Sequence, residues 1–450
     1  MFSCFKDKEF LNKFIKISLP IELSSLISFL ISFVDNIMVG SISNEAVGGV
    51  YAANQVTYLV WMAFYGILEG AGIFIQQYNG TSDQNHIKQC VRYKWYIASI
   101  LLIIILPLVY FFGKHLIIAY SNKDTNFELI LEEGMSYLKI VLISYIPTAI
   151  SFIYAYTLRE IGKTIYPMIS STIAIILNCL LNALFIYGLK MGAPGAAIAT
   201  VIARTFECIF LVAVSKIKRF EFAIKTFETF KIDKELFKEI TKKTWPLFLN
   251  EVGFAVGMML QSLAFSQRDS VLSSISIAST VAEIFAVFGS GLAVGIGVIV
   301  GSYLGSDKYD EAIDANKKLL FLGINISILL GIIIAGLSPV IPKLFREVAP
   351  DQKILATKLI LIFASVLVFQ TIALVSYYTL KTGGRTIETL ILDTGSTVIF
   401  YLPVSWSLAV HTSIDTLYIF LIVRSVDIIK AVAGIYFIRK RKWAKNITIK

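Results

Sequence analysis

Two short stretches of the chain occur twice. Residues 157–165 read TLREIGKTI, and residues 379–387 read TLKTGGRTI. Residues 77–83 read QYNGTSD, and residues 302–307 read SYLGSD. Because both pairs keep their order and nearly the same separation, they predict that the chain is a duplicated unit of roughly 220 residues.

The composition is that of a membrane protein. Of the 450 residues, 56% are hydrophobic and 16% are charged, and the mean hydropathy is +0.73. A soluble chain of this length would carry more charge on its surface. The apolar residues gather in blocks that are each long enough to cross a hydrocarbon layer of about 30 Å as a helix. The twelve blocks are 14–36, 47–74, 94–113, 130–156, 166–189, 194–216, 245–266, 273–303, 317–341, 354–379, 388–410 and 414–438.

We therefore expect an all-α integral membrane protein with twelve transmembrane helices. The first block is longer than a signal-peptide core and lacks a small-residue cleavage site, so it is expected to remain as the first span. Six spans lie in each half, so both halves enter the membrane from the same side and form parallel six-helix repeats. The predicted parts are an N-terminal lobe (1–216), a cytoplasmic connection (217–243) and a C-terminal lobe (244–450). Such a duplicated apolar chain is typical of a transporter, in which two similar halves move about a central site.

The basic residues predict the orientation. Most of the 41 Lys and Arg residues fall in alternate loops, chiefly in residues 216–243 and 439–442. Loops rich in Lys and Arg stay in the cytoplasm, so we expect both termini there, in a multi-pass protein of the cell (plasma) membrane. One loop disagrees, because four basic residues there fall outside: Lys343, Arg346, Lys353 and Lys358. The net charge of +10 is thus accounted for by topology and does not indicate a nucleic-acid partner.

Charged side chains within the predicted spans are candidates for function, because they are costly in lipid. In two pairs, a basic and an acidic residue lie three positions apart on one helix and are expected to neutralise each other. These pairs are Arg204 with Glu207 and Arg424 with Asp427.

Three acids have no cation three or four positions away on their own helix. They are Asp35 in the first span, Glu251 in the seventh and Asp393 in the eleventh. Each must find a partner in another span, bind a cation or stay protonated. These three residues are therefore the candidates for ion coupling.

Two amides in the fifth span add to this pattern. Asn178 and Asn182 are four residues apart and share one helix face, and Thr200 follows in the sixth span. They either form hydrogen bonds between helices or provide oxygen ligands for Na⁺. Beside Asp35 they would make a small oxygen-rich site, and the same carboxylate could instead carry a proton.

Several longer motifs occur in a defined order along the twelve spans. They are DNIMVG at 35–40, QQYNG at 76–80, Asn178 and Asn182 before PGAAIAT at 194–200, Pro246 before Asn250 and Glu251, and GGRT at 383–386. On these motifs the chain resembles the MATE family, the multidrug and toxic compound extrusion transporters, over almost its whole length.

This resemblance implies a fold and an activity. The fold would be MATE-like, with two six-helix lobes arranged in a V around a central cavity. The activity would be the exchange of Na⁺ or H⁺, moving inward, for an organic compound moving outward. The implied partners are a drug-like small molecule, usually cationic and amphipathic, and the lipid bilayer. We expect the chain to work as a monomer.

The resemblance also implies site residues in the first lobe. In one branch of the family the cation site has an acid that matches Asp35, and other polar members that match Tyr137, Asn178 and Thr200. Asn182 stands where that branch often has a second carboxylate. A bound Na⁺ would then contact Asp35, Asn178 and Thr200.

In another branch, acids of the second lobe matter. Glu251 matches the acid of the seventh span there. The tenth span has no carboxylate in residues 369–380, where that branch has one. Asp393, one span later, is the candidate replacement.

Other classes of protein are alternatives to such an exporter. A flippase for lipids or lipid-linked oligosaccharides, of a related fold, would favour a strongly cationic cavity, and Lys139 and Arg204 are the midspan basic residues of the first lobe. A major-facilitator carrier would have a loop rich in Gly and Arg where residues 80–83 read GTSD. The four Cys and three His residues are scattered, so we expect no disulfide, no metal cluster and no catalytic constellation. The chain is thus not expected to be an enzyme or to need a cofactor beyond its coupling ion.

Overall fold

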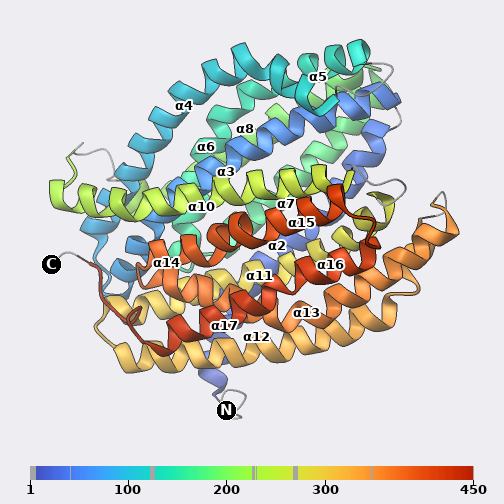
Figure 1. Ribbon diagram of the computed structural model, residues 1–450. Helices are drawn as coiled ribbons and strands as arrows, with labels where there is room; N and C mark the ends of the chain where they lie inside the picture. Colours follow the sequence, from blue (N-terminus) through green and yellow to red (C-terminus); the bar gives the residue numbers. More distant parts are fainter. Residues whose placement is uncertain are drawn as a thin grey trace. The chain divides into compact units, whose positions relative to one another are not determined.

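The computed structural model describes the backbone of residues 7–40, 42–121, 127–224, 229, 231–266, 272–345 and 348–448. Within these ranges it describes all side chains except those of residues 29–37, 40, 44, 119–121, 262, 263, 266, 272, 273 and 284. Over the described residues the regular structure is helical throughout (Figure 1).

The first six apolar blocks lie on six long helical segments. These are α2 (Lys8–Gly40), α3 (Asn44–Gly80), α4 (Gln84–Ser121), α5 (Phe127–Val141) continuing through η1 (Leu142–Ser144) into α6 (Tyr145–Glu160), α7 (Ile165–Asn182) continuing into η2 (Ala183–Gly188), and α8 (Gly192–Ile217). A short helix, α9 (Glu221–Ile224), follows in the connection.

The last six blocks lie on a second set. These are α10 (Lys234–Ser266), α11 (Leu272–Gly305), α12 (Tyr309–Leu337) followed by η3 (Ile341–Leu344), α13 (Pro350–Thr382), α14 (Thr386–Leu390) continuing through η4 (Ile391–Gly395) and η5 (Thr397–Tyr401) into α15 (Leu402–His411), and α16 (Thr416–Arg424) with α17 (Val426–Arg439). The prediction of an all-α chain with twelve long helical segments is confirmed. Among the described residues, nine segments are long and apolar enough to cross a membrane.

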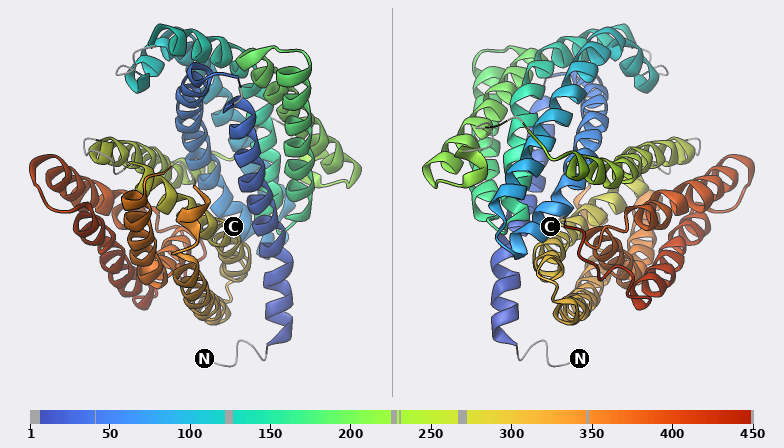
Figure 2. Two further views of the ribbon diagram at one scale, coloured as in Figure 1. Left: turned by 90° about the vertical axis from the view of Figure 1, so that its right-hand side faces the viewer. Right: turned by 90° about the vertical axis from the view of Figure 1, so that its left-hand side faces the viewer.

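By their contacts, the helices group into two compact units. The N-terminal unit contains Pro20–Ile75 and Asp83–Thr244, and the C-terminal unit contains Met1–Leu19, Gln76–Ser82 and Trp245–Lys450. In the N-terminal unit α8 is central, because it packs against α5, α6 and α7. In the C-terminal unit α13 has this place, between α11, α12 and α17 (Figure 1 and Figure 2). The lobe boundaries drawn from the sequence stay a prediction.

The first repeated motif ends a helix in the same way in both copies. Gly162 follows α6 and Gly384 follows α13, with φ values of +75° and +71°. In each copy the glycine N–H donates to the carbonyl three residues earlier, and the next N–H donates to the carbonyl five residues earlier, at 2.7 to 3.0 Å. This is a Schellman termination, which favours glycine at the left-handed position. The duplication therefore extends to the backbone conformation.

The second repeated motif brings the ends of α3 and α11 into contact within the C-terminal unit. A Cβ on Gly80 would overlap the carbonyl oxygen of Ser302, and a Cβ on Gly305 would overlap the carbonyl oxygen of Gln77. The Ser306 hydroxyl donates to the Gly80 carbonyl at 2.9 Å. Glycine is needed in both copies because here the two backbones touch.

The C-terminal tail packs on the same region. The buried Gln77 amide accepts a hydrogen bond from the Ile447 N–H at 2.9 Å and donates to the Lys445 carbonyl at 3.4 Å. Trp443 is 1% exposed and belongs to the hydrophobic core of the C-terminal unit. Its carbonyl oxygen lies against Gly383, where a Cβ has no room. The tail is thus held by one buried amide and one buried indole.

Replacing Gly383 with alanine is expected to release this tail, because the new Cβ would overlap the Trp443 carbonyl. Trypsin should then cleave after Lys445 several-fold faster in the purified protein, since cleavage follows local opening. Gly336→Ala is the matched control, because nothing lies within 4 Å of its Cβ position. If both variants are cleaved at the wild-type rate, this contact does not hold the tail.

Candidate functional site

Three of the predicted first-lobe residues meet inside the N-terminal unit. Asn182 Nδ2 donates to Asn178 Oδ1 at 3.4 Å, as expected for residues one turn apart on α7. Asn178 Nδ2 donates to the Thr200 hydroxyl of α8 at 3.4 Å, and that hydroxyl donates to the Ala196 carbonyl at 3.0 Å. Asn182 is 3% exposed. The three side chains therefore form a polar chain that runs from the interior of α7 to α8.

The other two predicted residues of this site are placed less fully. Tyr137 of α5 is buried, and its hydroxyl donates to Asn54 Oδ1 of α3 at 3.3 Å. Asn54 was not predicted, because a single amide in an apolar block forms no pattern with its neighbours. The backbone of Asp35 belongs to α2, but its side chain lies outside the described residues. Its role as the cation-binding acid stays a prediction.

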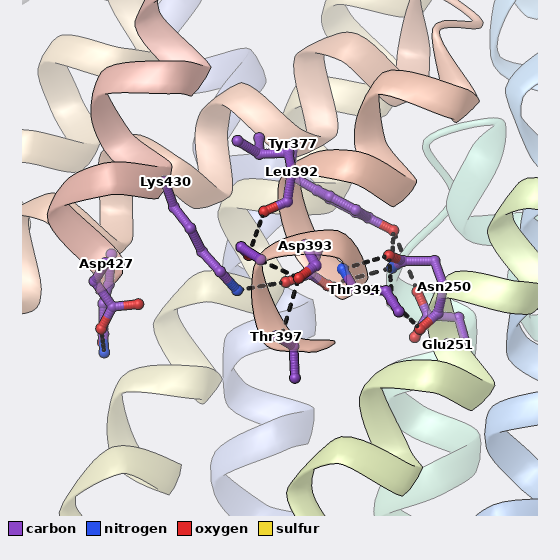
Figure 3. Close-up of polar contacts among 11 residues, drawn as sticks. Asn250, Glu251, Tyr377, Leu392, Asp393, Thr394, Thr397, Asp427 and Lys430 are labelled. Atoms are coloured by element: carbon purple, nitrogen blue, oxygen red, sulfur yellow. Dashed lines mark hydrogen bonds and ion pairs between the residues drawn. The ribbon is translucent and has the colours of Figure 1, made fainter. Parts of the chain in front are cut away.

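A larger polar cluster surrounds Asp393 in the C-terminal unit (Figure 3). Lys430 of α17 forms an ion pair with it, with Nζ 2.9 Å from Oδ1. Asn250 of α10 donates its Nδ2 to the other carboxylate oxygen at 3.2 Å. The acid thus has its cation on another helix, which spacing along its own helix cannot reveal.

Asn250 joins the second predicted acid to the same cluster. Its Nδ2 also donates to the Tyr377 hydroxyl at 3.1 Å, and that hydroxyl donates to Glu251 Oε1 at 3.2 Å. Its Oδ1 accepts from the Thr394 hydroxyl at 2.9 Å. Asn250 is 1% exposed, so these bonds form away from water. The structure therefore brings Glu251 and Asp393 into one hydrogen-bonded group.

Both units have π-helical turns next to their polar groups. Asp393 and Thr394 lie in η4, and η5 begins after one intervening residue. In the N-terminal unit, η2 begins directly after Asn182. π turns are rare and occur often at functional sites, because they widen the helix and redirect side chains. No residue pattern in the sequence predicts these π turns.

The sequence of the chain also matches a known protein family. The sequence matches the family model described as MatE over residues 20–184 and 246–407. The chain belongs to the MatE family. One matched range falls in each half, as expected for a duplicated MatE chain.

Curated relatives of this MatE chain are named as multidrug resistance proteins or transporters. A probable multidrug resistance protein NorM of Bacillus cereus is 26% identical over 333 residues, which cover 71% of this chain and 70% of that protein. A NorM of Thermotoga maritima is 25% identical over 335 residues, covering 72% and 70%. An uncharacterized transporter, YisQ of Bacillus subtilis, is 22% identical over 344 residues, covering 74% and 72%.

Solved structures share the MatE fold. An outward-facing multidrug resistance MATE transporter of the MOP superfamily has a TM-score of 0.87 at 17% identity, covering 96% of each chain. A MOP superfamily transporter from Pyrococcus furiosus, described as having a binding pocket of reverse polarity, has a TM-score of 0.86 at 17% identity, covering 97% of this chain and 96% of its own. The fold expected from the sequence motifs is thereby confirmed.

Of the two local ion pairs expected in this MatE chain, one forms. Arg204 and Glu207 are 2.8 Å apart on α8. In the described structure, however, Asp427 accepts a hydrogen bond from Gln370 Nε2 of α13 at 2.7 Å, and Arg424 lies over two phenylalanine rings. The second local pair was a wrong prediction, because contacts with α13 and neighbouring aromatics prevail over spacing on one helix.

A buried ion pair in the N-terminal unit was not predicted. Lys94 Nζ of α4 lies 2.5 Å from Glu160 Oε2 of α6, with side-chain exposures of 0% and 6%. Lys94 also donates to the Thr157 hydroxyl at 3.3 Å. Both charges lie at the ends of apolar blocks, where the sequence suggests contact with water, so only the packing of α4 on α6 reveals the pair.

Lys94→Met is expected to destabilise the protein by about 3–5 kcal/mol, because it leaves the Glu160 carboxylate buried without its cation. Arg204→Met should cost about 1 kcal/mol or less, since the Arg204 side chain is 42% exposed. Apparent melting temperatures in detergent measure both effects. The double variant Lys94→Met/Glu160→Gln should recover most of the loss. Equal melting temperatures for the two single variants would contradict this assignment.

Proposed function

We propose that this MatE chain is a secondary active antiporter that exports organic, cationic and amphipathic compounds in exchange for Na⁺ or H⁺. The multidrug resistance names of its relatives support the substrate class. The observation that carries the proposal is the polar chain from Asn182 through Asn178 to Thr200 inside an apolar bundle. Polar groups at membrane depth are costly and mark the paths of ions and protons.

In this proposal Asp35 is the acid that receives the coupling ion. The resemblance to the family implies that the other polar residues of this cation site are Tyr137, Asn178, Asn182 and Thr200. Carboxylate, amide and hydroxyl oxygens suit a hard cation such as Na⁺. A proton needs only the carboxylate. One site chemistry thus serves either ion, and transport measurements distinguish them.

Neutralising a buried carboxylate changes which helix packing is preferred. A shift of one pKa unit corresponds to about 1.4 kcal/mol of differential interaction, so modest changes around Asp35 are enough to bias two conformations. The coupling ion favours one conformation and the exported compound favours the other. Exchange follows, because each conformation releases what the other one binds.

The basic loops support a plasma-membrane protein with both termini in the cytoplasm, and the drug-like substrate and lipid bilayer are its partners. We propose a monomer as the working form, with Glu251 and Asp393 as polar groups of the second lobe. A lipid flippase is not favoured, because the relatives have multidrug resistance names.

Asp35→Asn should slow cation-driven efflux of a lipophilic cationic dye from proteoliposomes by at least about tenfold, a loss of 1.4 kcal/mol or more. The amide keeps the shape of the side chain but cannot take up the ion's charge. Glu283→Gln is the control, because it removes an exposed carboxylate of α11. Wild-type efflux by Asp35→Asn, under the same gradient, contradicts the proposal.

The coupling ion is identified by imposing the two gradients separately. With an inward Na⁺ gradient at equal pH, or an inward H⁺ gradient without Na⁺, one of the two should accelerate dye efflux in wild-type protein. The same gradient should have no effect on Asp35→Asn. If neither gradient changes the wild-type rate, the chain is not an ion-coupled antiporter.

A further inference from the structure

Lys430 is a charged side chain in the last predicted span that the proposed site does not use. It lies on α17, and its side chain is 14% exposed. A lysine at this depth is costly unless it has a partner. Its ammonium lies 2.9 Å from Asp393 Oδ1, so the cost is offset by an ion pair with another helix.

The Asp393 carboxylate is held in place by a second helix besides α17. Its second carboxylate oxygen accepts from Asn250 Nδ2 at 3.2 Å. Asn250 is itself held by the Thr394 hydroxyl and by Tyr377. The two oxygens of Asp393 thus have different partners: the Asn250 amide donates to one, and the Lys430 ammonium is paired with the other.

A second acid lies on the other side of Lys430. Asp427 is three residues earlier on α17, so the two side chains are neighbours on one helix face. Its carboxylate accepts from Gln370 Nε2 at 2.7 Å. In Figure 3, Lys430 lies between the two acids and its ammonium points to Asp393.

We propose that Lys430 is a tethered cation that alternates between Asp393 and Asp427. With the Lys430 ammonium on it, Asp393 needs no ion from solution. When a proton or Na⁺ reaches Asp393, the ammonium moves to Asp427, so that each of the two acids then has one positive partner. This movement replaces a contact between η4 and α17 with a contact inside α17. The charge on Asp393 therefore changes how these two helical segments pack. The inference rests on the proposed ion-coupled exchange.

The first test measures ion binding without transport. It uses purified protein in an Asp35→Asn background, so that the first-lobe candidate does not contribute. Adding Lys430→Met should make the apparent melting temperature rise by roughly 2 °C or more with increasing NaCl or with falling pH, since a solution cation now binds Asp393. Choline chloride is the ionic-strength control.

Three matched variants in the same background should show no such rise. Lys430→Arg keeps a tethered cation, Lys430→Met/Asp393→Asn removes the acid, and Lys139→Met removes an exposed lysine from a span of the N-terminal unit. An ion response in any of them, or a flat response in Lys430→Met, overturns the proposal.

The second test does not depend on the folding of Lys430→Met. Asp427→Asn leaves the Lys430–Asp393 pair intact and retains an oxygen for the Gln370 amide. Because the ammonium then has only one acid, dye efflux should be at least about tenfold slower. When Lys430→Met is already present, adding Asp427→Asn should have little further effect.

These outcomes separate this inference from the proposed function. Wild-type efflux by Asp427→Asn overturns the alternating lysine, while the loss of cation-driven efflux in Asp35→Asn would still stand. If Asp35→Asn exports at the wild-type rate, the antiport proposal fails, and the melting-temperature responses still decide whether Lys430 occupies a cation site.

Discussion

Polar groups inside an apolar helix bundle must find their partners within the bundle, and this constraint explains the two polar clusters described above. In the N-terminal unit, amides of α7 are paired with each other and with a hydroxyl of α8. In the C-terminal unit, Asp393 is paired with Lys430 and Asn250. Each cluster ties helices together through bonds that lipid cannot replace, so a change of charge at Asp393 or Lys430 changes helix packing.

The duplication is visible in details that have no role in ion binding. Gly162 and Gly384 terminate their helices with the same left-handed turn, and Gly80 and Gly305 make reciprocal close approaches. The polar clusters, in contrast, have diverged, because one is built from amides and the other has an internal lysine. A common scaffold thus supports two different kinds of buried polar cluster.

The sequence was sufficient for the helices and for part of the site. Apolar block length predicted all twelve helical segments, and four-residue spacing predicted that Asn178 and Asn182 share a face. Spacing failed for Asp427, whose partner Gln370 is on α13, and it missed Lys94 with Glu160, which are 66 positions apart. Partners on different helices depend on packing, and π turns such as η4 shift side chains in ways that no periodicity encodes.

Exchange is tested most directly in the reverse sense, because coupling between two ligands is reciprocal. Proteoliposomes are loaded with a cationic dye, no ion gradient is imposed, and the entry of Na⁺ or H⁺ is recorded as the dye leaves. Antiport predicts that the dye gradient drives one of these ions inward, and that Asp35→Asn abolishes its entry. Dye efflux through wild-type protein with no accompanying ion entry would contradict ion-coupled export.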